Sequence, residues 1–287
     1  MNRENLDRWC ERGILGLILA ILIYGPLATG AVRTPDFLVL QGLTLGVMLL
    51  WGLRLWLNPR PKFLWPPICW AVLAFTAYVV VRYLAANIEY VARLEMIRVL
   101  IYAFLFFAIL NNLHRQESTQ IISFTMIFLA MAIALYAIYQ FLTDSNRVWD
   151  FIKPYAHRGS GTYISPNNLA GFLEMLLPLG LAYILIGRAK PVTKVLLGYA
   201  SLVILAGIGV TVSRGGWLST ALSLLIFLGI VAFRRNYRLP AFVLFVVIVG
   251  VGAYFVPRSY FLQARLKQAY ENGQVNDNSR FELWKPA

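Results

Sequence analysis

The sequence predicts an all-α, polytopic membrane protein with about nine transmembrane helices. Of its 287 residues, 59% are hydrophobic and only 14% are charged, whereas about a quarter of the residues of a soluble domain are charged. The hydrophobic residues fall in runs of about 20 residues, the length at which a helix crosses a bilayer core of about 30 Å. Basic residues outnumber acidic ones by 26 to 13, which gives a formal net charge of +13. These observations exclude a soluble globular domain.

Charged residues, prolines, asparagines and glycines separate the apolar runs and set the ends of the predicted spans. The first run follows three arginines and ends in LATGA, as a secretory signal would, but acidic residues before it and eight later spans favour an uncleaved anchor. In chain order the predicted spans are 13–32, 37–53, 64–81, 94–113, 121–142, 169–187, 195–212, 216–233 and 239–256.

The distribution of lysine and arginine orients these spans. With the N-terminus in the cytoplasm, half of the 26 basic residues fall in short inner segments, which include RPK, GRAKPVTK and FRRNYR. The other half spreads over roughly twice as many outer positions. An odd number of spans then places the C-terminus outside. Membrane topology therefore explains much of the positive charge without a nucleic-acid partner.

The longest outer loop carries a polar segment that membrane insertion does not explain. It ends in HRGSGTYISPNN, directly before the predicted span 169–187, and contains Arg158, Asn167 and Asn168. Asn167 or Asn168 is the expected N-cap of that helix, and free N–H groups at a helix start attract anions. The segment lacks the pattern of a P-loop or a dinucleotide fingerprint. The alternative interpretation is a simple turn followed by a cap.

A second polar element lies at Arg214, which interrupts the apolar stretch 195–233 in the segment GVTVSRGGWLST. An arginine there should face a polar cavity or the outer headgroups, since lipid tails would not tolerate it. Snorkelling to headgroups would explain Arg214 alone. Ser213 precedes it, and Gly215 and Gly216 follow, so that backbone N–H groups can open beside the guanidinium. A planar guanidinium can hold two phosphate oxygens at once, which favours a phosphate ligand.

Two further charges complete the candidate site. Arg280 lies in SRFELW, one helical turn before Trp284 and after a predicted amphipathic helix at 263–270. Alone, Arg280 is an ordinary surface residue. Glu174 is a rare charge inside a predicted span, and it either pairs with an outer arginine or contacts a substrate directly.

The predicted topology puts Arg158, Arg214 and Arg280 on one face beside the membrane, which favours a site for a lipid-linked diphosphate. The chain contains two cysteines and two histidines, without CxxC or HExxH spacing, so we expect no zinc site and no metal dependence.

Three segments, RGSGTYISPNNLAGFLEMLLPL, VTVSRGGWLS and NSRFELW, resemble in order and spacing the O-antigen ligase and O-antigen polymerase family of bacterial envelope enzymes. The resemblance covers residues 155–287. It divides the chain into an N-terminal part, 1–154, with about five spans, and an O-antigen ligase-like part, 155–287, with about four spans and the start of a periplasmic segment.

The resemblance implies a multi-pass glycosyltransferase of the GT-C type in the bacterial inner membrane, with a cytoplasmic N-terminus and a periplasmic C-terminus. Such enzymes need neither metal nor cofactor. They pass a glycan from undecaprenyl diphosphate to a saccharide acceptor, such as the lipid A core or a growing polysaccharide. By motif position, the expected catalytic residues are Arg214 and Arg280, and the expected substrate-binding residues are Arg158, Asn167, Asn168, Ser213 and Glu174.

The sequence departs from the family after its last motif. Family members usually continue into a large periplasmic loop with a His-Asn pair, whose histidine is the expected general base, and His157 matches no part of that motif. We therefore expect the chain to be a fragment that binds the donor without completing the transfer. A small-anion transporter is the alternative function, although the spans hold few charges that would form an ion path. A non-enzymatic component of envelope assembly is a third.

Overall fold

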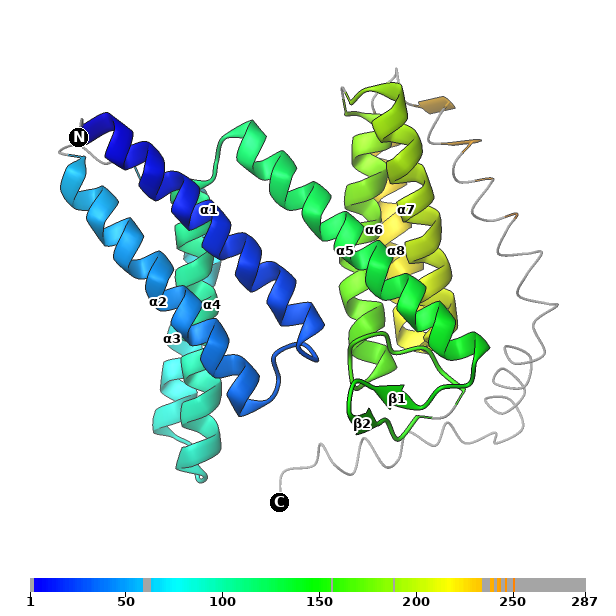
Figure 1. Cartoon of the computed structure of the whole chain (residues 1–287), viewed down its shortest axis with the longest axis horizontal. Helices are drawn as coiled ribbons and strands as arrows, with labels where there is room; N and C mark the ends of the chain where they lie inside the picture. Colours follow the sequence, from blue (N-terminus) through cyan, green and yellow to red (C-terminus); the bar gives the residue numbers. More distant parts are fainter. Residues whose placement is uncertain are drawn as a thin grey trace.

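The computed structural model describes residues 3–58, 63–155, 157–187 and 189–233, with a few isolated positions from 238 to 250. Within these residues the chain forms eight helices and one short β-hairpin (Figure 1). The helices are α1 (Arg3–Leu27), α2 (Thr34–Leu57), α3 (Ile68–Leu84), α4 (Glu89–Asn112), α5 (Gln116–Leu142), α6 (Pro166–Leu185), α7 (Pro191–Val210) and α8 (Arg214–Ala232). The hairpin strands are β1 (Arg147–Val148) and β2 (Phe151–Ile152).

The predicted all-α membrane fold is confirmed. Each of the first eight predicted spans overlaps one helix, and seven of these helices are long and apolar enough to cross a membrane. The exception, α3, has 17 residues, which makes it about 25 Å long against a bilayer core of about 30 Å. The predicted span 239–256 lies almost entirely outside the described residues, and the predicted helix 263–270 and Arg280 lie wholly outside them.

The first helix begins at Arg3 rather than near Gly13, because its acidic residues find a partner on α2. Nε of Arg54 lies 2.8 Å from Oδ1 of Asp7, and Nη2 of Arg54 lies 3.1 Å from Oε2 of Glu11. The same guanidinium donates to Oδ1 of Asn112 at 3.0 Å. We call these four residues the Arg54 network. It joins the start of α1 to the ends of α2 and α4.

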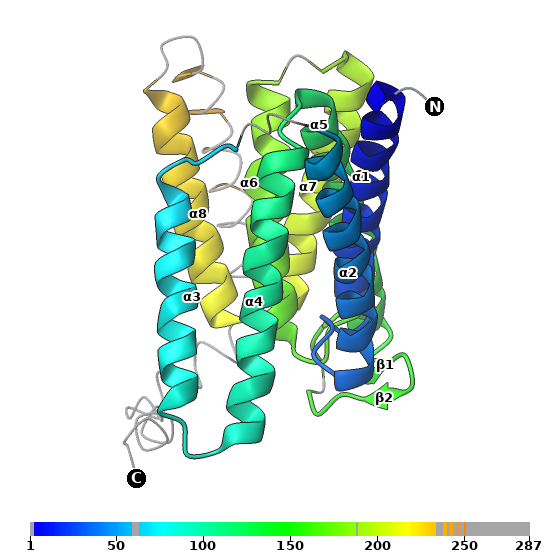
Figure 2. The same ribbon diagram turned by 90° about the vertical axis from the view of Figure 1, so that its left-hand side faces the viewer.

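Successive helices run in opposite directions, as the predicted topology requires (Figure 2). The ends of α1, α3, α5 and α7 and the starts of α2, α4, α6 and α8 therefore lie at the same end of the molecule, the lower end in Figures 1 and 2, where β1 and β2 also lie. We call this the loop end of the molecule. The Arg54 network lies at the opposite end. Assignment of the loop end to the periplasm remains a prediction.

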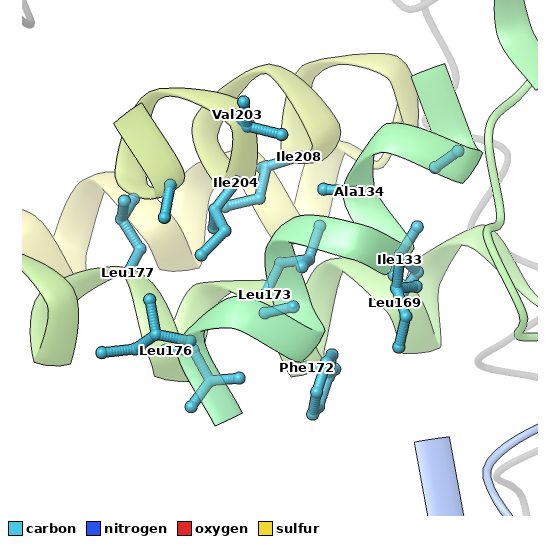
Figure 3. Close-up of a cluster of buried hydrophobic side chains, with 14 of the residues drawn as sticks. Ile133, Ala134, Leu169, Phe172, Leu173, Leu176, Leu177, Val203, Ile204 and Ile208 are labelled. Carbon is cyan, nitrogen blue, oxygen red and sulfur yellow. The ribbon is translucent and has the colours of Figure 1, made fainter. Parts of the chain in front are cut away.

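The helices form two groups, each with its own hydrophobic core. Helices α1, α2 and α4 share one cluster of buried residues, and α3 packs on α4. Helices α5 to α8 share the other, part of which Figure 3 shows between α5, α6 and α7. Close approach of α5 and α7 depends on Gly207, where an added Cβ atom would lie 2.6 Å from Cβ of Ala134. The candidate site lies at the loop end of this second group.

Candidate functional site

The segment between α5 and α6 connects the two helix groups. Oγ1 of Thr162 donates to the carbonyl oxygen of Pro26 at 2.6 Å, and Nε1 of Trp149 donates to the carbonyl oxygen of Leu27 at 3.0 Å. Both acceptors belong to the last turn of α1. This segment, residues 143–165, therefore holds α1 against the C-terminal helix group.

The two glycines of RGSG let this segment lie directly on the helices. A Cβ atom on Gly159 would lie 2.6 Å from the carbonyl oxygen of Ala137, and one on Gly161 would lie 2.7 Å from Cγ2 of Ile133. Gly161 also has φ +57, a conformation that glycine adopts without strain. The N–H of Gly159 donates to the carbonyl oxygen of Val210 at 2.9 Å. The glycines thus serve close packing against α5 and α7.

Gln140, in the last turn of α5, forms four hydrogen bonds with this segment through its side chain. It is 1% exposed. Its Nε2 donates to the carbonyl oxygens of Arg147 and Gly161, both at 3.0 Å, and its Oε1 accepts from the N–H groups of Ser160 at 3.1 Å and Gly161 at 2.9 Å. Sequence reasoning missed Gln140 because it lies in an apolar run. A glutamine one turn before a long loop was the only signal.

Arg158 joins three parts of the loop end. Its Nε donates to the carbonyl oxygen of Thr211, the C-cap of α7, at 2.8 Å. Its Nη2 donates to Oδ1 of Asn167, in the first turn of α6, at 3.0 Å. The guanidinium carbon also lies 5.5 Å from the centre of the Tyr155 ring. Two of the residues expected at the site, Arg158 and Asn167, are therefore in direct contact.

The expected N-cap of α6 was wrong. The cap is Ser165, whose Oγ accepts from the N–H of Asn167 at 3.3 Å, and Pro166 is the first helical residue. Proline favours that position because it lacks an N–H and disfavours a helical conformation in the residue before it. Asn167 and Asn168 are therefore the second and third helical residues, and both are exposed.

Arg214 is the first residue of α8, so the break expected in the apolar stretch 195–233 lies between α7 and α8. Ser213 caps α8 and accepts from the N–H of Gly216 at 3.2 Å. The turn before it is tight, since Val212 has φ 50, which is rare for a β-branched residue. Arg214 is exposed, and no described residue forms an ion pair or side-chain hydrogen bond with it. Arg214 and Gly215, the first two residues of α8, are thus both exposed at the loop end.

In its first turn, directly after Arg214, α8 contacts α6. An added Cβ atom on Gly216 would lie 2.5 Å from Cβ of Ala170. One turn further into the bundle, Oγ of Ser219 donates to Oε2 of half-buried Glu174. Ser219, which the sequence did not suggest, thus binds Glu174 within the described residues, where an outer arginine was one of the two expectations. A substrate contact by Glu174 remains a prediction.

Two further polar residues of the loop, Lys153 and His157, make contacts that the sequence did not suggest. Lys153 is 3% exposed, and its Nζ donates to the carbonyl oxygen of Arg158. Burial lowers the pKa of Lys153, an effect that the nearby Asp144 carboxylate opposes. His157, expected to be a simple loop residue, has Nδ1 2.8 Å from Oδ1 of Asp144, and both residues are more than half exposed.

The described side chains offer no group of three or more His, Cys, Asp and Glu residues that would hold a metal ion. Independence from metals remains a prediction, because this observation does not cover the rest of the chain.

Comparison with known families gave a match to the C-terminal part of the chain. Residues 199–287 match the family model for O-antigen ligase. The range contains Ser213, Arg214 and Arg280 and begins after Arg158 and Glu174. The resemblance to this family is therefore confirmed over the last part of α7, over α8 and over the residues that follow. Comparison with curated proteins gave no match, and neither did comparison with solved structures.

Proposed function

From the match of residues 199–287 to the O-antigen ligase family, we propose that the protein is a glycosyltransferase that uses undecaprenyl diphosphate as the carrier of the donor glycan. The proposed acceptor is a saccharide hydroxyl of the lipid A core or of a growing polysaccharide. The apolar helices support a multi-pass membrane protein. We place the reaction at the loop end, which we assign to the periplasmic side of the bacterial inner membrane.

The observation that carries this proposal is the arrangement of Arg158 and Arg214. Arg158 binds the carbonyl of Thr211, and Arg214 follows that residue across a tight turn. Two guanidinium groups from different segments thus lie around one short turn. Arg214 adds the start of α8, where N–H groups and the helix dipole favour an anion. The exposed Arg214 suits a phosphate, since a guanidinium can hold two phosphate oxygens through paired hydrogen bonds. Arg158, which already donates to Thr211 and Asn167, adds positive charge beside the turn.

The same groups would assist the chemical step. The acceptor hydroxyl oxygen attacks the anomeric carbon of the donor, and its proton passes to water or to the departing diphosphate. The bond from that carbon to the diphosphate oxygen breaks, and undecaprenyl diphosphate leaves with additional negative charge. Arginines held in place beforehand stabilise that charge without reorganising, which can be a dominant part of an enzyme's rate enhancement. We assign this role to Arg214 and, by motif position, to Arg280. In the proposed site Arg158, Asn167, Asn168, Ser213 and Glu174 bind the substrate.

The test uses the full chain in lipid nanodiscs with undecaprenyl diphosphate as the probe. Arg214→Ala and Arg280→Ala should each weaken binding by about ten- to a hundredfold, the range of one charged hydrogen-bonding group. Arg82→Ala is the matched control. Like Arg214, Arg82 is an exposed arginine at the loop end, where it lies in the last turn of α3. Wild-type affinity in both test variants would overturn the proposal. Anion flux in proteoliposomes without any lipid-linked donor would instead favour a transporter.

A further inference from the structure

Gln140 uses every hydrogen-bonding group of its side chain on the loop that carries Arg158. A glutamine amide has two N–H donors and an oxygen with two lone pairs. The two donors reach the carbonyl oxygens of Arg147 and Gly161, and the oxygen accepts from the N–H groups of Ser160 and Gly161. A buried amide with all four contacts made is highly specific for one loop conformation.

These contacts close the loop from both of its sides. Arg147 begins β1, and Ser160 and Gly161 follow Arg158 by two and three positions. A single side chain on α5 therefore fixes the first residue of the strand pair and two residues that follow the pair. The N–H of Gly159 adds a contact to the carbonyl oxygen of Val210 on α7. Arg158 thus emerges from a backbone that is held on two helices.

We propose that Gln140 is a positioning residue for the diphosphate site and acts through Arg158. Its hydrogen bonds fix the position of the RGSG backbone relative to α5. This position allows the Arg158 guanidinium to reach the carbonyl oxygen of Thr211 and the side chain of Asn167. Gln140 itself is buried and does not contact the substrate. The inference rests on the proposed function, in which Arg158 binds the diphosphate.

A buried amide with a purely structural role should affect stability without affecting diphosphate binding. Asn112 provides the comparison. Asn112 is also a buried amide near the end of a helix, 2% exposed, and also makes contacts through both its nitrogen and its oxygen. It lies in the Arg54 network, at the end of the molecule opposite the loop end. Asn112→Leu and Gln140→Met therefore remove comparable buried amides, but only Gln140→Met removes contacts to the loop.

The experiment combines two measurements on the full chain in lipid nanodiscs. Hydrogen exchange should show Ser160 and Gly161 losing protection by about ten- to a hundredfold in Gln140→Met, since their N–H groups lose a buried acceptor. Undecaprenyl diphosphate should bind at least about tenfold more weakly to Gln140→Met and normally to Asn112→Leu. Gln140→Glu keeps the acceptor oxygens and should retain most of the protection at both amides. Should Gln140→Met fail to fold, Gln140→Glu is tested by ligand binding instead. It removes the donors to the carbonyl oxygens of Arg147 and Gly161, so undecaprenyl diphosphate should bind it at least about tenfold more weakly, and unchanged binding would refute the positioning role.

A double-mutant cycle with Arg158→Ala shows whether the effect passes through Arg158. If it does, Gln140→Met weakens binding in the presence of Arg158 and has no further effect in the Arg158→Ala background. Equal losses in both backgrounds, or unchanged binding by Gln140→Met while Arg158→Ala weakens it, would refute the positioning role alone. Unchanged binding by Arg158→Ala itself would refute the place of Arg158 in the proposed function, and the inference with it.

Discussion

Gly216 of α8 lies against Ala170 of α6 so closely that a Cβ atom on the glycine would be 2.5 Å from Cβ of the alanine. This contact lies between exposed Arg214, two residues earlier on α8, and half-buried Glu174, one turn further along α6. The separation of α6 and α8 at this contact therefore also sets the distance between Arg214, the proposed diphosphate-binding residue, and the carboxylate of Glu174.

Substitution of Gly216 by alanine should destabilise the protein by about 1–3 kcal/mol, the usual cost of an added methyl group in a packed interior. The neighbouring Gly215→Ala is a stringent control, because among the described residues an added Cβ atom there would meet nothing within 4 Å. It should leave stability nearly unchanged. Thermal unfolding in detergent micelles measures both effects, and equal melting temperatures for the two variants would contradict the close contact.

Ser165→Ala should lower stability by about 0.5–2 kcal/mol, the usual cost of removing an N-cap side chain. The reason is that the N–H of Asn167 would lose its acceptor at the start of α6. Asn168→Ala, at an exposed position of the same helical turn, should cost less. The same thermal measurement distinguishes the two, and a larger loss for Asn168→Ala would return the cap to the asparagines.

Arg54→Met should destabilise the junction of α1, α2 and α4 by about 1–3 kcal/mol, less than a fully buried ion pair would give because the Asp7 side chain is partly exposed. The loss arises because Asp7 and Glu11 would keep their charges without the guanidinium that contacts both. Arg12→Met is the control, because Arg12 is exposed on α1, the helix that carries Asp7 and Glu11. Adding Asp7→Asn and Glu11→Gln to Arg54→Met should recover part of the stability, and failure to do so would argue against a charge effect.

The buried Lys153 predicts a stability that rises with pH. Burial lowers its pKa in the folded protein below the ordinary value of 10.5, so between these two values the unfolded chain binds more protons than the folded one. Stability therefore increases as pH rises through that window and levels off above it. Lys153→Met should flatten this dependence. Unfolding temperatures recorded from about pH 8 to 10.5 provide the comparison, and parallel curves for the two proteins would contradict it.

The helices were predictable because a bilayer imposes a single requirement, a sufficient length of apolar side chains. The start of α1 was not, since hydropathy treats Asp7 and Glu11 as loop residues and gives no sign that Arg54 neutralises them across helices. The N-cap of α6 was available from the sequence: Pro166 disfavours a helical conformation in the residue before it and so identifies Ser165 as the cap.

The candidate site was only partly predictable. Topology placed Arg158 and Asn167 on one face, and their hydrogen bond agrees with that expectation. Gln140 and Lys153 escaped because their partners are backbone groups, and no local pattern of side chains identifies such a contact in advance. Long-range contacts of this kind depend on how the chain folds back on itself, which composition and periodicity do not specify.

The loop end is held mainly by side chains that donate to main-chain carbonyl oxygens: Trp149 to Leu27, Thr162 to Pro26 and Arg158 to Thr211. Every residue type carries such an oxygen, so the acceptor positions can change identity while each contact persists, provided that the backbone keeps its course. The donors have no such freedom. The acceptor positions should therefore tolerate substitution and the donor positions should not. A substitution at an acceptor position would select no compensating substitution at the donor position. Residue covariation among homologues would leave these contacts undetected, although the two to Leu27 and Pro26 join the two helix groups.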